Sequence, residues 1–394
     1  MASGLKAKLA ALKGAAPQAV TAARDTGLIV KTSRLPLDCR IYALPPVGLR
    51  RIGWSGRTFD IRKCLFLDTE TTGLSGGAGT VAFLVGVGYV EGDSFVVEQF
   101  MLRDYGDEPE LIDRLSRRME GFDSVCTFNG RCFDMPLLEA RFTMCRMRDR
   151  WRELEDIDLL YPARRVWKLR MGSCRLARIE EIILGKPRED DLPGSEVPAR
   201  FFQYLKCGDE SLLRDIVDHN RQDIATLATL LILLCDINDR PEQLMDPRDQ
   251  FSMGKSLERQ GELKPAREMY RVSAIPRPSG TIASLGADRV SGMANWRLYH
   301  LYRRSGDWES ARKVLEQMLN RRQMPGVACV ELSKLYEHRF KEYGMALEYA
   351  TKAGEYADSE SEEKLKRRVE RISGKQAEQQ KQSIPQERGT YGSL

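Results

Sequence analysis

The chain has 394 residues, of which 42% are hydrophobic and 30% are charged, and its formal net charge is +5. This length allows two or three domains with ordinary cores, and the mild positive charge is compatible with nucleic acid without being diagnostic of it. The nine cysteines lack the short paired spacings of zinc sites and disulfide frameworks. Because the sequence has no apolar segment of membrane-spanning length and no secretory signal, we expect a cytoplasmic protein with no membrane partner.

The first residues have little to bury. Residues 1–34 are rich in alanine and lysine, which predicts a basic tail. Residues 35–62 contain short extended pieces interrupted by proline and glycine, and we expect them to wrap around the first domain as a lead-in segment. The first domain is therefore expected at residues 63–237.

This domain has the pattern of a mixed sheet flanked by helices. Strands are expected at residues 64–67, 81–90, 94–102, 124–128 and 156–160. Helices are expected at about residues 108–120, 135–147, 172–184, 196–206 and 211–235. Three consecutive strands followed by alternating helices and strands indicate an α/β fold.

An acidic pair follows the first of these strands. Because side chains two residues apart on a strand point to the same face, the carboxylates of Asp68 and Glu70 would project together. Two carboxylates held on a rigid strand are suited to Mg²⁺ or Mn²⁺. A solvated acidic turn is the alternative for an isolated pair, but further acidic positions downstream favour a metal site.

Two later segments supply those positions. Asp134 follows Asn129 and Phe133 and precedes a proline by two residues, so it is either an acidic ligand or the N-cap of a helix. His219 and Asp223 are four residues apart in a predicted helix and would share one face. A structural role is the alternative for this histidine.

Taken together, DTETTG at 68–73, N-x-x-x-F-D at 129–134 and H-x-x-x-D at 219–223 resemble the three exonuclease motifs of the DEDD superfamily of 3′–5′ exonucleases. The resemblance covers about residues 60–236 and implies a ribonuclease H-like fold. It extends to the bacterial YprB-like group, in which such a domain is joined to a TPR-like region. The ligands that it implies for two Mg²⁺ or Mn²⁺ ions are Asp68, Glu70, Asp134 and Asp223.

The resemblance also implies a general base and a substrate site. The general base would be His219, although this histidine stands at the spacing used by the superfamily's tyrosine branch. It is therefore open whether it accepts the proton of the attacking water or only orients that water. The substrate-binding residues suggested in this way are Thr69, Thr72, Leu74, Asn129 and Phe133. A basic stretch at residues 164–178 would either follow phosphates or form a solvated helix face.

The composition changes after residue 237. Residues 238–250 are polar and contain proline, which predicts a linker, and residues 251–372 have an all-helical pattern. Within it, Ala311 and Ala346 are separated by close to the ~34-residue period of TPR repeats, and Ala266 precedes them in a similar context with an insertion at 275–290. We expect a TPR-like domain that packs through these alanines and offers a concave surface for a protein or nucleic-acid partner. Because only two to three repeats are present, packing support for the first domain is the alternative. Residues 373–394 are polar and are expected to be disordered.

The sequence therefore predicts an α/β ribonuclease H-like domain followed by an all-α TPR-like domain. The expected activity is two-metal 3′–5′ exonucleolytic hydrolysis of single-stranded nucleic acid, with the 3′ end as the substrate. One alternative is a non-catalytic nucleic-acid-binding adaptor that recruits partners through its helical region, and another is a structure-specific endonuclease. The choice between DNA and RNA stays open.

Overall fold

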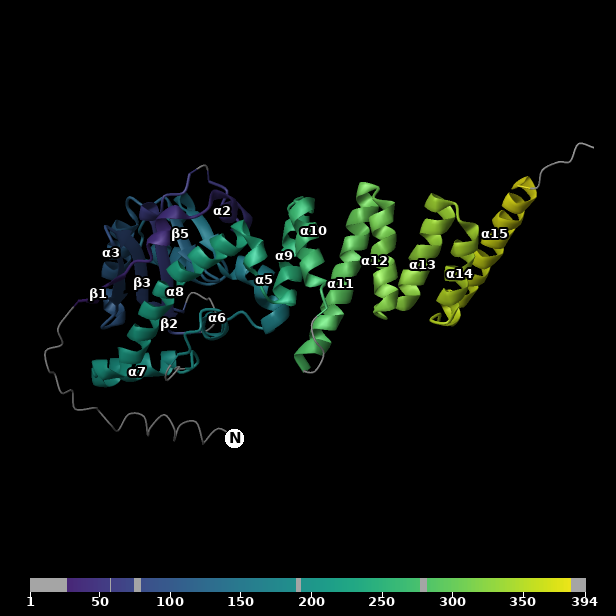
Figure 1. Cartoon of the computed structure of the whole chain (residues 1–394). Helices are drawn as coiled ribbons and strands as arrows, with labels where there is room; N and C mark the ends of the chain where they lie inside the picture. The colour runs from purple at the N-terminus through teal and green to yellow at the C-terminus, as the bar shows by residue number, and fades with distance from the viewer. Residues whose placement is uncertain (1–26, 57, 74–78, 189–192, 277–281, 384–394) are drawn as a thin grey trace, which may run out of the picture.

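The computed structural model describes residues 27–56, 58–73, 79–188, 193–276 and 282–383. Most of the predicted basic tail therefore lies outside the described residues, as do Leu74 and residues 384–394. A six-stranded mixed sheet organises the N-terminal part of the molecule (Figure 1). Its strands are β1 (Ile29–Pro36), β2 (Cys64–Thr71), β3 (Ala82–Glu91), β4 (Ser94–Met101), β5 (Ser124–Thr127) and β6 (Glu155–Asp158), in the spatial order β1-β4-β3-β2-β5-β6.

The pairing of the central strands decides where the loops gather. β2 runs antiparallel to β3 and parallel to β5, and β5 runs parallel to β6. The carboxyl ends of β2, β5 and β6 therefore lie at the same edge of the sheet. Short 3₁₀ helices complete the connections: η1 (Cys39–Ala43), η2 (Ile61–Lys63), η3 (Tyr105–Asp107), η4 (Trp151–Glu153), η5 (Glu210–Leu213) and η6 (Pro241–Gln243).

Helices cover both faces of the sheet, as the sequence predicted. Cys64 and Phe66 of β2 belong to one hydrophobic core, and Leu65 and Leu67 belong to the other. Within the α/β domain, the helices of the first core are α2 (Pro46–Ile52), α5 (Leu160–Met171), α6 (Leu176–Ile182) and most of α8 (Arg214–Asp239). Those of the second core are α3 (Glu108–Met119), α4 (Asp134–Met144) and α7 (Val197–Cys207). This alternation along β2 fixes the direction of the acidic residues that follow.

Two glycines of β3 let α8 lie directly on the sheet. A Cβ atom on Gly86 would lie 2.1 Å from Oδ1 of Asn220, and one on Gly88 would lie 2.4 Å from Cγ2 of Ile224. Asn220 and Ile224 belong to α8, so only glycine fits at these two strand positions. Gly86 is the β3 partner of Asp68 on β2. The helix is thereby brought next to the acidic end of β2.

Two edges of the domain differ from the prediction. The expected tail boundary at residue 34 falls inside β1, which pairs with β4 over its full length. Only Ile29 of this strand is buried, so its sequence has no alternating apolar pattern, and backbone pairing holds it in place. The strand expected to reach residue 160 ends at Asp158, whose carboxylate accepts the N–H of Leu160 at 3.0 Å as α5 begins. The helix predicted at 172–184 is shorter in the structure. Gly172, with φ 71°, ends α5, and the helix that follows, α6, covers only Leu176–Ile182.

The C-terminal region is helical, with antiparallel neighbours that extend away from the sheet as a row (Figure 1). Its helices are α9 (Pro247–Arg259), α10 (Leu263–Ser273), α11 (Ile282–Ser305), α12 (Trp308–Asn320), α13 (Pro325–Leu335) with the π-helical turn η7 (Tyr336–Phe340), α14 (Tyr343–Gly354) and α15 (Ser359–Ser383). Ala266, Ala311 and Ala346 are each fully buried, which confirms their predicted packing role. Part of the predicted insertion is the start of α11. Among the helices in the described ranges, none combines the length and the apolar character that crossing a bilayer requires.

The segment predicted as a linker is a packed junction. Residues 238–250 contain the end of α8, η6 and the start of α9, and Asp249 and Gln250 within them are 3% and 4% exposed. Arg170 of α5 pairs with Asp249 through Nε and Oδ2 at 3.0 Å, and Arg51 of α2 pairs with Glu262. Buried polar contacts therefore fix the helical region to the α/β domain.

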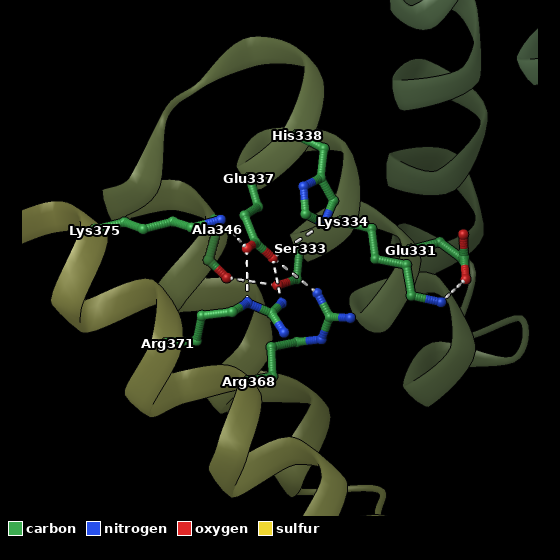
Figure 2. Close-up of polar contacts among 9 residues, drawn as sticks. All are labelled: Glu331, Ser333, Lys334, Glu337, His338, Ala346, Arg368, Arg371 and Lys375. Carbon is green, nitrogen blue, oxygen red and sulfur yellow. Dashed lines mark hydrogen bonds and ion pairs between the residues drawn. The ribbon is translucent and has the colours of Figure 1, made fainter.

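A buried carboxylate anchors the last helix. The side chain of Glu337 has no exposed surface and is contacted by Arg368, Arg371 and Lys375 of α15, as Figure 2 shows. Arg371 donates from Nε to Oε1 at 2.9 Å and from Nη2 to Oε2 at 2.7 Å. Lys375 lies beyond residue 373, so the disorder expected from there is wrong for the part of α15 that reaches Ser383.

Candidate active site

The acidic end of β2 faces α8. Asp68 and Glu70 lie on the same face of β2 as Cys64 and Phe66. Both acidic residues are half-buried. Thr69 lies between them and has the opposite direction, toward α4. Because successive side chains of a strand point to opposite faces, the two acids lie on one face of β2 and Thr69 lies on the other.

Asp134 is brought to the same edge of the sheet by the loop that follows β5. It is the first residue of α4 and is 5% exposed, and Phe133 holds the N-cap position without a side-chain hydrogen bond. Its Oδ1 atom accepts a hydrogen bond from Oγ1 of Thr69 at 2.5 Å. The N-cap alternative is therefore wrong for Asp134, and the carboxylate is oriented by β2.

α8 contributes the remaining residues. Asn220 is fully buried; its Nδ2 donates to Oδ2 of Asp68 at 2.9 Å, and its Oδ1 accepts from Nε2 of Gln99 at 2.9 Å. His219 is half-buried on the same helix, one turn before Asp223. The polar chain from Gln99 through Asn220 to Asp68 holds this part of α8 in register with β2.

Arg188, in the segment after α6, lies between two acids. It donates to Asp223 and also, from Nε at 2.5 Å, to Oε2 of Glu180. Glu180 is 1% exposed and accepts further hydrogen bonds from Thr226 and, at 3.4 Å, from Gln222. Arg188 therefore compensates the charge of Asp223 and is itself held by a buried carboxylate.

Three of the four carboxyl groups have raised pKa values. Burial and the charges of Asp223, Asp134 and Glu70 raise the pKa of Asp68 well above its usual range. Burial, with Asp223 and Asp134, raises the pKa of Glu70 to about 8. Burial also raises the pKa of Asp134 to about 6, against the lowering effect of the Thr69 hydrogen bond. Such mutual effects require the acids to lie near one another in a poorly solvated place.

The donor set fits a hard divalent cation, because all four acids offer oxygen and a cation would relieve their repulsion. Within the described part of the chain, however, no group of three or more histidine, cysteine or acidic side chains is arranged so that it could hold a metal ion. The pairing of Asp223 with Arg188 and of Asp134 with Thr69 turns two of the carboxylates toward protein donors. Metal binding would therefore require at least one of these side chains to change partner.

The other predicted site residues are placed as follows. Thr72 holds the β2–β3 connection, since its Oγ1 accepts the N–H of Val81 at 3.0 Å. Asn129 has φ 71° and donates its backbone N–H to Oδ1 of Asp158 at 2.8 Å, and Phe133 is half-buried beside Asp134. Leu74 lies outside the described residues. The substrate roles of these residues stay predictions.

Three residues at the site were missed from the sequence. Asn220 stands next to His219 in the third motif, so its position in the motif was an available signal. Glu180 and Arg188 had none, because they reach the site through the packing of α6 against α8 rather than through any pattern along the chain.

The arrangement can be compared with known proteins. The RNase H superfamily model matches residues 65–235, which contain all four carboxylates and His219. A relative from Bacillus subtilis (strain 168), the uncharacterized protein YprB, is 30% identical over 328 residues, covering 82% of this chain and 77% of YprB. The chain belongs to the YprB family. Its first domain is therefore a ribonuclease H-like mixed sheet with flanking helices, and a helical region follows.

Among solved structures, a family B DNA polymerase from the hyperthermophilic archaeon Pyrobaculum calidifontis is similar with a TM-score of 0.34 and 15% identity. The match covers 62% of this chain and 30% of the polymerase, so the chain spans less than a third of that protein.

Proposed function

We propose that the protein is a metal-dependent 3′–5′ exonuclease that hydrolyses single-stranded nucleic acid. Membership of the RNase H superfamily supports a nuclease-type activity. The observation that carries the proposal is the gathering of Asp68 and Glu70 of β2, Asp134 of α4 and Asp223 of α8 at one edge of the sheet, where Thr69 orients Asp134 and Asn220 orients Asp68. Burial, and after it the neighbouring acids, raise the pKa values of Asp68 and Glu70 there. A surface ion-pair network would lower carboxyl pKa values, whereas an acidic cluster that raises them is suited to cations.

The residues of the site would have different roles in the reaction. The four carboxylates would hold two Mg²⁺ or Mn²⁺ ions, which when bound would activate water and stabilise the leaving 3′ oxygen. Asn220 would keep Asp68 aimed at this place, and Thr69 would do the same for Asp134. His219, one turn from Asp223, would accept the proton of the attacking water or orient that water.

The helical region is proposed to be TPR-like. The buried alanines and the succession of antiparallel helix pairs support this comparison, and such arrays commonly offer extended surfaces to partners. A protein partner of this region is part of the proposal.

The test is cleavage of 5′-labelled single-stranded DNA and RNA oligomers with Mn²⁺, Mg²⁺ or EDTA. The expected result is a ladder of shortened products that disappears with EDTA and with Asp68→Asn. Asp215→Asn on the exposed part of α8 is the matched control, because it removes the same charge away from the cluster. Asp215→Asn should cleave like wild type.

Two further substrates separate the alternatives. A circular single strand has no 3′ end, so its cleavage would replace the exonuclease by an endonuclease. Intact oligomers under every metal, combined with retained binding, would replace the enzyme by a nucleic-acid-binding adaptor.

A further inference from the structure

A groove with basic walls lies between α5 of the α/β domain and α9 of the helical region. It has a volume of about 680 Å³. On α5 it is lined by Tyr161, Arg164, Arg165 and Lys168, whose spacing of three and four residues places them on one helix face. The face of α9 is built in the same way from Ser252, Lys255, Ser256 and Arg259. Five cations and the hydroxyl groups of Tyr161, Ser252 and Ser256 thus line the groove, and no acidic residue is among its lining residues.

These five cations are not neutralised by the protein. Within the described residues, none of them forms an ion pair with a carboxylate, although Arg170, on the same helix as three of them, pairs with Asp249. Arg165 donates from Nη2 to the backbone carbonyls of Arg51 and Ile52, at 3.2 and 2.9 Å. Burial and the charge of Arg259 lower the pKa of Arg165. Like charges have therefore been gathered from two regions of the chain without internal compensation, which is typical of a surface that binds a polyanion.

The groove adjoins the candidate active site. Tyr161, at the start of α5, contacts Cys132 through Oη and Sγ at 3.3 Å, and its ring lies 5.8 Å from the guanidinium carbon of Arg131. Both residues belong to the loop that leads from β5 to Asp134. α5 starts where β6 ends, so Tyr161 lies at the same edge of the sheet as the carboxylates. Figure 1 shows α5 and α9 between the sheet and the other helices of the C-terminal region.

We propose that this α5–α9 groove binds the phosphate backbone of the single-stranded nucleic acid whose 3′ end enters the carboxylate site. The proposal rests on the proposed function for the identity of its ligand. Its own content is that the helical region supplies one wall of the substrate track, through Lys255 and Arg259.

Nucleic acid fits the groove better than an acidic protein segment for two reasons. The cations repeat along two helix faces, as regularly spaced phosphates require, and Ser252 and Ser256 add hydroxyl donors of the kind that bind phosphate oxygens. Tyr161, which is 37% exposed, presents a ring at the end of the groove nearest the carboxylates, where a base can stack on it.

The test compares Arg164→Gln/Arg259→Gln with a control, Lys313→Gln/Lys352→Gln. Both double variants remove two exposed positive charges, the first pair from the two walls of the groove and the second from α12 and α14. Binding of a 5′-fluorescein-labelled 20-nucleotide oligo(dT) is measured by anisotropy in EDTA at several salt concentrations. Losing two phosphate contacts should weaken binding by about tenfold or more at low salt and reduce the slope of log K against log salt by about 1.4. The control should match wild type.

A second measurement uses a trinucleotide with Mn²⁺. This substrate is too short to fill the groove, so the groove variant should cleave it at the wild-type rate while cleaving the 20-mer more slowly. Equal binding and equal cleavage of the 20-mer by the groove variant and wild type would overturn the proposal. Competition by poly-glutamate as strong as that by an oligonucleotide of equal charge would also overturn it, in favour of an acidic protein ligand.

These outcomes can be separated from those of the proposed function. If wild type binds the 20-mer through the groove but cleaves nothing with any metal, the groove assignment stands and the nuclease proposal fails. If wild type cleaves and the groove variant is unaffected, only the groove assignment fails.

Discussion

Replacing Glu70 by glutamine should stabilise the metal-free protein, and the gain should grow with pH. The folded-state pKa of Glu70 is raised to about 8, chiefly by burial and then by Asp223 and Asp134. In an unfolded chain a glutamate ionises at about 4.3. A group with a raised folded pKa contributes full stability below its unfolded pKa, and this contribution is lost as pH rises through the folded pKa.

The size of the effect follows from these two values. Between about pH 4.3 and pH 8 the loss is about 1.4 kcal/mol per pH unit, so wild type would lose about 1 kcal/mol at pH 5 and roughly 3–4 kcal/mol at pH 7. The glutamine has no charge to desolvate and avoids this loss. At roughly 2–4 °C per kcal/mol for a domain of this size, the melting temperature of Glu70→Gln should exceed that of wild type by roughly 6–16 °C at pH 7.

The assay is thermal unfolding in EDTA from pH 5 to 8, followed by circular dichroism. Glu181→Gln, at an exposed position of α6, is the control and should follow wild type. Adding Mn²⁺ should stabilise wild type more than Glu70→Gln, because the variant lacks one anionic ligand. If wild type and Glu70→Gln lose stability in parallel as pH rises, the pKa of Glu70 is not raised in the folded protein, and the argument for a poorly solvated acidic cluster fails.

Three other substitutions test the supports of the site and of the last helix. Gly86→Ala should destabilise the protein by about 1–3 kcal/mol in urea unfolding, because the new methyl group would meet Oδ1 of Asn220; Gly106→Ala, which has open space, should cost less. Arg188→Gln should lower the stability of the metal-free protein by about 2–4 kcal/mol, because it leaves the buried Glu180 without its cation. Arg200→Gln, which removes a surface ion pair with Asp215, is the control. A smaller loss of stability for Arg188→Gln than for Arg200→Gln would contradict this role of Arg188. For Glu337, burial favours the neutral acid, but hydrogen bonds from Arg371 and Lys375 lower its pKa to about 2. Its stabilising effect is therefore present above about pH 4.3 and lost as pH falls toward 2, so at pH 7 Glu337→Gln should make α15 more sensitive to proteolysis, and the difference from wild type should vanish near pH 2.

The central part of the fold was predictable because its elements carry strong local patterns. The apolar runs at 64–67 and 81–90 correspond to strands at the centre of the sheet, where both faces are buried. The direction of Asp68 and Glu70 then followed from the period of two along a strand. The match of residues 65–235 to the RNase H superfamily model confirms the ribonuclease H-like fold class of this domain.

The errors lie where long-range contacts decide the structure. β1 exposes most of its side chains, so only its pairing with β4 identifies it as a strand. α15 is polar enough to suggest disorder, yet Arg368, Arg371 and Lys375 gather around Glu337, a partner more than 30 residues away. Arg188 reaches Asp223 from a segment without any motif. None of these partners can be identified from the residues near it in the chain.

The junction between the two regions explains why the helical part bears on the chemistry. The hydrophobic core on the α8 side of the sheet is continuous from Phe66 of β2 through Phe251 of α9 and on to Ala346 of α14. α8 carries Asp223 and ends in the packed segment before α9, while α5 starts beside the site and forms one wall of the groove. A shift of α9 would therefore move both the groove and the support of α5. Removal of the helical region would expose the apolar surface of α5 that packs on α9, and α5 begins beside the loop that leads to Asp134.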